Sequence, residues 1–198
     1  MRLVNELRVG VPVEQTWGTL LDVPRVARAL PGATIEPEAD GGAWRGTMRI
    51  KLGPVTTDYA GTARLQDADE DARVAAYRVE GREARGQGSA AATITARLHA
   101  EGDGTRVVVE TDLQVTGRQA QLGRNLMEDV AGAILAEFAG RLERELRGIS
   151  APLAGDAGDD ALDVGGAVRR AMAERAALVG AGVLVGGGIG FLLGRRSP

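Results

Sequence analysis

Residues 118–147 read RQAQLGRNLMEDVAGAILAEFAGRLERELR, and this stretch decides the fold. Apolar side chains recur at every fourth position, which is typical of a helix that lays one face on a core. We therefore expect one long helix over residues 118–147. Its apolar stripe consists of Leu122, Leu126, Val130, Ile134, Phe138, Leu142 and Leu146.

The residues before this helix alternate between apolar and polar side chains, which predicts antiparallel strands with one buried face. Prolines open two short helices, over 13–21 and 24–30, after the first strand. This order predicts an α+β, helix-grip fold, in which an antiparallel sheet wraps around the long C-terminal helix. Strands are expected at about 2–9, 44–52, 58–65, 75–80, 92–99 and 106–115, with a weaker, proline-interrupted edge strand over 34–38.

Composition excludes several kinds of chemistry. The 198 residues include no Cys, so disulfides, thiolate metal sites and a Cys nucleophile are ruled out. The single histidine, His99, falls on a polar strand face, so we expect neither a metal site nor Ser/His catalysis. The alternation predicts no inward-pointing Asp, Glu, Lys or His, and hence no general acid–base pair. We expect a protein that is not an enzyme and that has no covalent cofactor. With a net charge of −3, we also expect no nucleic-acid partner.

The C-terminal part has a different character. Residues 176–194, AALVGAGVLVGGGIGFLLG, carry no charge and are flanked by arginines on both sides. A helix of this length spans roughly 28 Å, about one hydrocarbon thickness of a bilayer. The sequence therefore predicts a body over 1–147, a flexible acidic linker over 148–166 and a basic-flanked membrane anchor over 167–198. The anchor's apolar residues are Leu178, Val183, Leu184, Val185, Ile189, Phe191, Leu192 and Leu193.

Glycines recur at every fourth position of this tail, at Gly182, Gly186, Gly190 and Gly194. Such spacing lets a second helix approach closely in lipid, which favours self-association or docking to a partner's membrane segment. A general bias toward Gly and Ala explains the spacing equally well. Because the N-terminus carries no signal peptide, we expect a C-terminal tail anchor with the body on the cytoplasmic face of the cell membrane. Whether the tail spans the bilayer or lies along it stays open.

The inward positions of the predicted sheet are unusually small, since many are Gly or Ala. A face of this kind either draws the helix very close or leaves a cavity. A cavity here would be apolar and would suit a large hydrophobic ligand. Its lining would come from Asn5, Trp44, Met48, Ile50, Tyr59, Ala63, Tyr77, Ala92, Ile94, Ala96, Val109, Thr111, Leu126, Val130, Ile134 and Phe138.

The chain resembles the CoxG family of carbon monoxide dehydrogenase subunits, within the polyketide-cyclase and START-like lipid-transfer superfamily (SRPBCC). The segments that carry the resemblance lie within residues 2–147 and include VPVEQTWGTLLDVPRVARALPGA, RIKLGPVTTDYAGTARL, GSAAATITARL and GTRVVVETDLQVTGRQAQLGR. The Leu-Pro-Gly-Ala element at residues 30–33 and the Val-Thr-Gly exit at residues 115–117 are its more specific parts. Ala29 departs from the family pattern, in which Cys commonly stands at this position, so no thiol role is expected there.

The resemblance implies a deep cavity between the sheet and the C-terminal helix, and an accessory role beside a molybdenum-containing carbon monoxide dehydrogenase. Together with the predicted anchor, it suggests a carrier for a membrane quinone, menaquinone by preference. The carrier would extract the quinone, shield its isoprenoid tail and present the head to the dehydrogenase. A cargo-free tether that recruits the dehydrogenase to the membrane, a cyclase or hydrolase, and a generic lipid or fatty-acid carrier are the alternatives.

Overall fold

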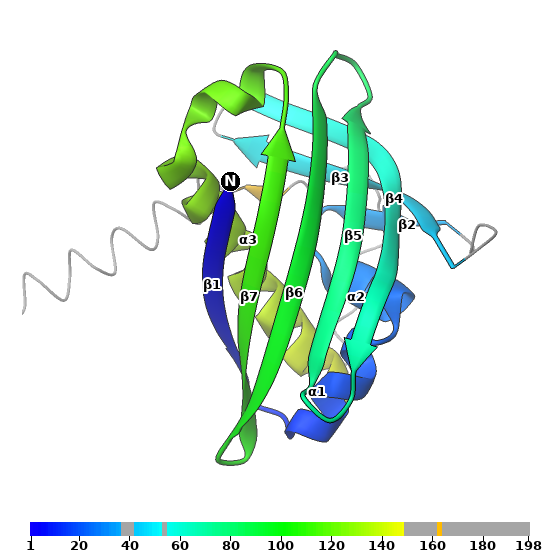
Figure 1. Ribbon diagram of the computed structural model, residues 1–198, viewed down its shortest axis with the longest axis vertical. Coiled ribbons are helices and arrows are strands. Elements are labelled where there is room, and N and C mark those ends of the chain that lie inside the picture. Colours follow the sequence, from blue (N-terminus) through cyan, green and yellow to red (C-terminus); the bar gives the residue numbers. More distant parts are fainter. Residues whose placement is uncertain (37–41, 53–54, 149–161, 164–198) are drawn as a thin grey trace, which may run out of the picture.

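The alternating residues form a strongly curved antiparallel sheet that holds a long helix on its concave side (Figure 1). The structure, a computed structural model, describes residues 1–36, 42–52, 55–148 and 162–163. Its strands are β1 (Arg2–Val9), β2 (Ala33–Ile35), β3 (Trp44–Leu52), β4 (Val55–Asp69), β5 (Val74–Glu83), β6 (Ser89–Glu101), β7 (Gly104–Val115) and β8 (Leu162–Asp163). Its helices are α1 (Val13–Leu20), α2 (Val23–Ala29), the 3₁₀ helix η1 (Arg118–Leu122) and α3 (Arg124–Leu146).

The strands follow the order β1-β7-β6-β5-β4-β3-β2, so the first strand pairs with the last long one. The predicted fold class is confirmed, and the predicted edge strand is β2, at the far side of the sheet. In the predicted linker, Leu162 and Asp163 pair as β8 in parallel with Ile50 and Lys51 of β3. The linker's other residues beyond position 148 and the whole predicted anchor lie outside the described residues.

The segment after β7 is not one continuous helix, and that prediction is wrong. Gly123 has a φ of 77°, in the left-handed region that interrupts helical hydrogen bonding, and it separates η1 from α3. The apolar stripe itself is confirmed over α3, where Val130, Phe138 and Leu142 are buried. The break lets η1 turn across the upper end of the sheet while α3 runs down behind it (Figure 1).

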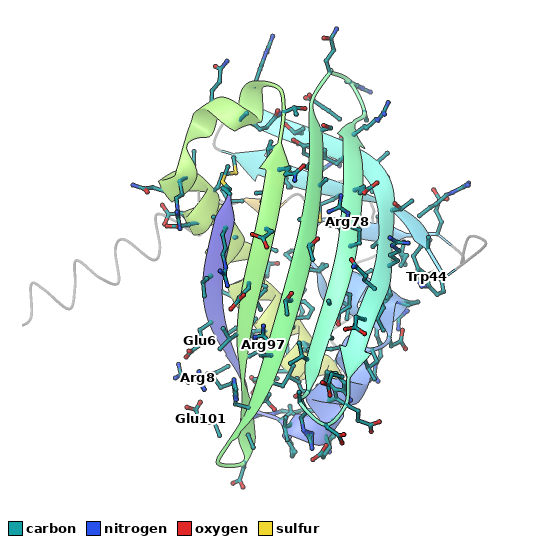
Figure 2. The ribbon with its side chains drawn as sticks, viewed as in Figure 1. Glu6, Arg8, Trp44, Arg78, Arg97 and Glu101 are labelled. Atoms are coloured by element: carbon teal, nitrogen blue, oxygen red, sulfur yellow. The ribbon has the colours of Figure 1, made fainter. Side chains whose placement is uncertain are left out.

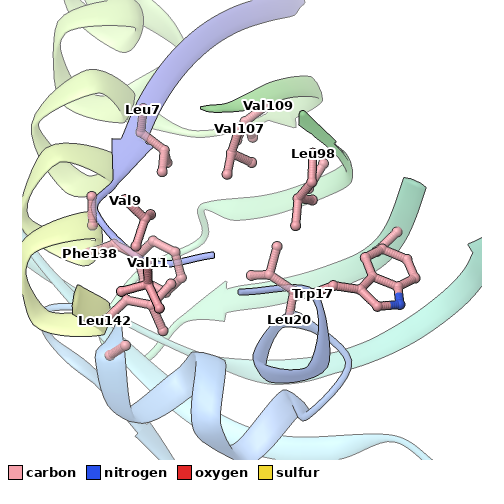
Figure 3. Close-up of a cluster of buried hydrophobic side chains, with 14 residues drawn as sticks. Leu7, Val9, Val11, Trp17, Leu20, Leu98, Val107, Val109, Phe138 and Leu142 are labelled. Atoms are coloured by element: carbon pink, nitrogen blue, oxygen red, sulfur yellow. The ribbon is translucent and has the colours of Figure 1, made fainter. Parts of the chain in front are cut away.

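The lower half of the interior is closed by α1, which lies at the lower end of the sheet in Figure 1, and by α2, which lies behind the sheet. Figure 3 shows Trp17 and Leu20 of α1 on one side of this interior and Phe138 and Leu142 of α3 on the other, and all four belong to one buried cluster. We call this set the lower cluster. Its buried members are Leu7, Val9, Val11, Trp17, Leu20, Ala29, Ala75, Ala96, Leu98, Val107, Val109, Phe138, Ala139 and Leu142.

The outer face of the sheet is charged, as the alternation predicts (Figure 2). Cross-strand ion pairs cover it, among them Arg2 with Glu110 at 2.6 Å and Arg49 with Asp58 at 2.6 Å. His99 is exposed. Among the residues that the structure describes, no helix is long and apolar enough to cross a membrane.

Candidate ligand site in the interior

The strand register brings the inward-facing residues of the upper half into rows that cross the sheet. One row runs Trp44, Ala63, Val79, Ala92 and Leu113, from β3 to β7. The next row towards the upper end contains little side-chain volume, because four of its five residues are Gly or Ala. It consists of Gly46, Gly61, Gly81, Ala90 and Val115. Six of the small inward residues therefore lie in these two rows, whereas Ala75 and Ala96 pair with each other in the lower cluster.

Close backbone contacts explain why some positions of this row must be glycine, but they do not explain every small residue in it. A Cβ at Gly61 would lie 1.9 Å from the Glu80 carbonyl oxygen, so only glycine fits there. A Cβ at Gly81 would have no neighbour closer than 3.5 Å. Ala90, next to Gly81, is only half-buried although it faces inward. A methyl group would therefore fit at Gly81, in ordinary contact with the Tyr59 side chain.

The core is divided as a consequence. The lower cluster is separate from a second, smaller one, in which Ile50, Leu126, Ala133 and Ile134 pack around buried Val130. Single domains usually have one contiguous core. Tyr59 and Ala92 are 8% and 3% exposed, yet both lie outside the two clusters formed by the described side chains. Met48, Ala63 and Val79 face inward, stay half-buried and also belong to neither. We call the region between the clusters the open half.

The structure brings together many of the residues that the sequence suggested as ligand-binding. Trp44, Met48, Tyr59, Ala63 and Ala92 share the inner face of the open half. Four more form the second cluster on its α3 side: Ile50, Leu126, Val130 and Ile134.

Other suggested residues lie elsewhere. Ala96, Val109 and Phe138 belong to the close-packed lower cluster, and Tyr77 and Ile94 pack against it. Their side chains hold the lower half together, and a ligand contact for them stays a prediction.

Two suggested polar residues lie on neighbouring strands beneath α3. Asn5 of β1 and Thr111 of β7 are half-buried. The Asn5 amide lies near α3, where a Cβ at Gly132 would be 3.6 Å from Asn5 Nδ2. Asn5 Oδ1 is buried and has no hydrogen-bond partner among the described residues. It is an acceptor that faces an apolar interior.

The prediction that no acidic side chain points inward is wrong. Glu83 stands directly opposite Tyr59 and two residues beyond Gly81, so it shares the inner face of β5. The strand expected from the sequence ends at Glu80, whereas β5 continues to Glu83. The inward direction of Glu83 follows from the alternation, because Val79 and Gly81 point to the same face.

Gln119 is a second residue of this site that the sequence pattern does not predict. It lies in η1, is 9% exposed, and its Nε2 donates to Thr57 Oγ1 of β4 at 3.4 Å. No sequence signal links these two residues, because the contact joins segments far apart in the chain. It fixes η1 over the upper end of the open half.

The two tyrosines have different roles in this interior. The Tyr77 hydroxyl donates to the Leu20 carbonyl, and burial raises the pKa of Tyr77. The pKa of Tyr59 is also raised, first by burial and then by the negative charge of Glu83. The Tyr59 hydroxyl makes no hydrogen bond among the described residues, so its donor is available to a bound molecule.

Solved structures show the same fold at low sequence identity. A conserved protein from Geobacillus kaustophilus matches with 17% identity and a TM-score of 0.65, over 75% of this chain and 96% of that one. A protein from Thermus thermophilus matches with 17% identity and a TM-score of 0.55, over 76% of this chain and all of that one (100%). Norcoclaurine synthase from Thalictrum flavum, solved with dopamine and hydroxybenzaldehyde, matches with 16% identity and a TM-score of 0.50, over 76% and 88% of the two chains.

Sequence comparison is more specific. No curated protein matches the chain significantly. The sequence profile of CoxG, a family named as a subunit of carbon monoxide dehydrogenase, matches residues 6–147, which is nearly the whole described body. The chain belongs to the CoxG family of carbon monoxide dehydrogenase subunits.

Proposed function

We propose that this chain is a membrane-anchored accessory protein of a molybdenum-containing carbon monoxide dehydrogenase, and that it carries a hydrophobic ligand between the membrane and that enzyme. Family membership supports the accessory role. The observation that carries the ligand proposal is the divided core, in which small inward residues lie between two separate apolar clusters. An interior of this kind suits a large apolar molecule with few polar groups.

The ligand that fits best is a quinone, menaquinone by preference. Oxidation of carbon monoxide releases electrons that a respiratory chain must accept, and the carrier of electrons in the bilayer is a quinone. The open half would cover its isoprenoid tail, and residues 167–198 would keep the body at the cytoplasmic face of the membrane. The ring chemistry belongs to the quinone and to the dehydrogenase's cofactors, so this chain acts as a carrier and not as an enzyme.

Neighbouring residues of β6 provide the test. Ala90 faces inward beside Gly81, whereas Ala91 pairs with Gln114 on the outer face. An Ala90→Phe side chain enters the open half, and an Ala91→Phe side chain points to solvent. Menaquinone that remains bound after purification and gel filtration is extracted and measured by mass spectrometry.

We expect Ala90→Phe to lower the retained menaquinone about tenfold, and Ala91→Phe to leave it unchanged. Thermal unfolding of both variants shows whether each still folds. Full retention by Ala90→Phe would contradict binding in the open half. An empty wild-type protein would support the cargo-free tether, and mixed phospholipid in place of quinone would support the generic lipid carrier.

A further inference from the structure

The upper end of the open half contains a group of polar side chains. Thr57 and Tyr59 come from β4, Glu83 from β5 and Gln119 from η1. Thr57, Tyr59 and Gln119 are 4%, 8% and 9% exposed. Glu83 is half-buried. Buried polar atoms normally have hydrogen-bond partners, so one in this set that has none needs an explanation.

Two acceptor oxygens of this set gather around Gly88, in the loop between β5 and β6. The Gly88 N–H donates to Glu83 Oε2 at 3.3 Å. A Cβ at Gly88 would lie 2.9 Å from Glu83 Oε2 and 3.1 Å from Gln119 Oε1. The absent side chain of this glycine therefore lets a carboxylate and an amide oxygen approach the same point.

Within the described part of the chain, the Gly88 N–H is the one donor that reaches these acceptors, and it reaches Glu83 alone. Gln119 Oε1 is buried and has no hydrogen-bond partner in the described part of the chain. No ion pair between described residues includes Glu83. A carboxylate at neutral pH and an amide oxygen only accept hydrogen bonds. The nearby Tyr59 hydroxyl, opposite Glu83, is a donor without a partner among the residues described.

A site with two acceptors and one donor distinguishes a hydroxyl of a bound ring from a carbonyl. A ring hydroxyl can accept from Tyr59 and at the same time donate to Glu83 or Gln119. A quinone carbonyl can only accept, so it would leave Gln119 Oε1 unpaired and would face the negative charge of Glu83. We propose that this end of the interior binds the ring hydroxyl of a hydroquinone, and that it holds the reduced ligand more tightly than the oxidised quinone.

The inference rests on the proposed function, since it assigns the head-group end of the same interior. One hydrogen bond of ordinary strength to a buried acceptor corresponds to about a tenfold difference in affinity. A tenfold preference for the reduced form raises the potential of the bound two-electron couple by about 30 mV. The protein would thus make its bound quinone easier to reduce than free quinone.

Calorimetric titration of the full chain under argon tests the preference. The probes are menadione and menadiol, the oxidised and reduced forms of the menaquinone head group. The variants are Glu83→Gln, which keeps the shape and removes the charge, and Gln119→Leu, which removes the unpaired acceptor. Glu80→Gln is the matched control, because Glu80 is exposed on the same strand and pairs with Arg78 at 2.9 Å.

We expect the wild-type chain and Glu80→Gln to bind menadiol about tenfold more tightly than menadione. Glu83→Gln should bring the two affinities within about twofold, and Gln119→Leu should weaken menadiol binding alone. If Glu83→Gln does not fold, Gln119→Leu still decides between the outcomes.

Equal affinities in the wild-type chain, or a preference that survives both variants, would overturn the inference while leaving the carrier function intact. If menaquinone is retained but neither head-group probe binds, the inference is also overturned and the carrier function stands. A chain that binds neither probe and retains no menaquinone would overturn the proposed function as well.

Discussion

Tyr77 on β5 donates a hydrogen bond from its hydroxyl to the backbone carbonyl of Leu20, the last residue of α1. The bond joins the sheet to the helix that closes the lower cluster. It also uses the Tyr77 hydroxyl within the protein, whereas the Tyr59 hydroxyl on the neighbouring strand has no such partner among the described residues. The two tyrosines therefore mark the difference between the closed floor of the interior and the open half above it.

We predict that Tyr77→Phe lowers the free energy of unfolding by about 1–2 kcal/mol, because it leaves the Leu20 carbonyl without its donor. Urea denaturation measures the change. Tyr59→Phe is the control and should have little effect on stability, since it breaks no hydrogen bond within the described part of the chain. Equal destabilisation by both variants would show that loss of the hydroxyl from the interior matters more than its partner.

Alkaline pH should destabilise the folded chain through these two residues, which are its only tyrosines. Both pKa values are raised above the ordinary value of 10.0. A raised folded-state pKa stabilises the fold fully below the unfolded pKa, and this contribution is lost as pH rises from about 10 through the folded pKa. Near-ultraviolet absorbance should show tyrosinate forming in denatured chain before native chain. Coincident titration curves would contradict the raised pKa values of the two tyrosines.

Two glycines of the inner row should differ in their tolerance of a methyl group. Gly61→Ala places a Cβ 1.9 Å from the Glu80 carbonyl, which forces the backbone of two paired strands apart. We expect a loss of about 1–3 kcal/mol in stability. Gly81→Ala, whose Cβ meets nothing closer than 3.5 Å, should cost far less. Thermal unfolding of the pair measures the difference, and the reverse order would contradict the better fit of a methyl group at Gly81.

Removal of residues 149–198 should separate membrane attachment from ligand binding. The family match ends at residue 147, and the described body extends to residue 148. We predict that the shortened chain leaves the membrane fraction yet still binds menaquinone in detergent. Flotation with membrane vesicles and extraction of the purified protein measure the two properties. Loss of quinone binding along with attachment would support the tether.

The alternation of apolar and polar residues was enough to predict the sheet, because every second side chain of a strand points to the buried face. The inward direction of Ala63 and Ala92 follows from it, whereas their place in one row depends on the strand register. The break at Gly123 was missed because a glycine within a regular apolar stripe is also tolerated inside a helix. Only the backbone conformation, with its φ of 77°, distinguishes the two cases.

The polar end of the site was harder to predict. Glu83 lay beyond the expected end of its strand, although its parity with Gly81 places it inward. Gln119 has no comparable signal, since its contact with Thr57 depends on how η1 folds across the sheet. The division of the core could not be read from the sequence either, because it depends on how closely α3 approaches each part of the sheet.

The most direct test of the carrier account is the content of the full chain purified gently from its native membranes. Solvent extraction and mass spectrometry identify and count what the protein holds. The account predicts about one menaquinone per chain, bound in the single divided interior. An empty protein, or one that holds only a mixture of phospholipids, would contradict it.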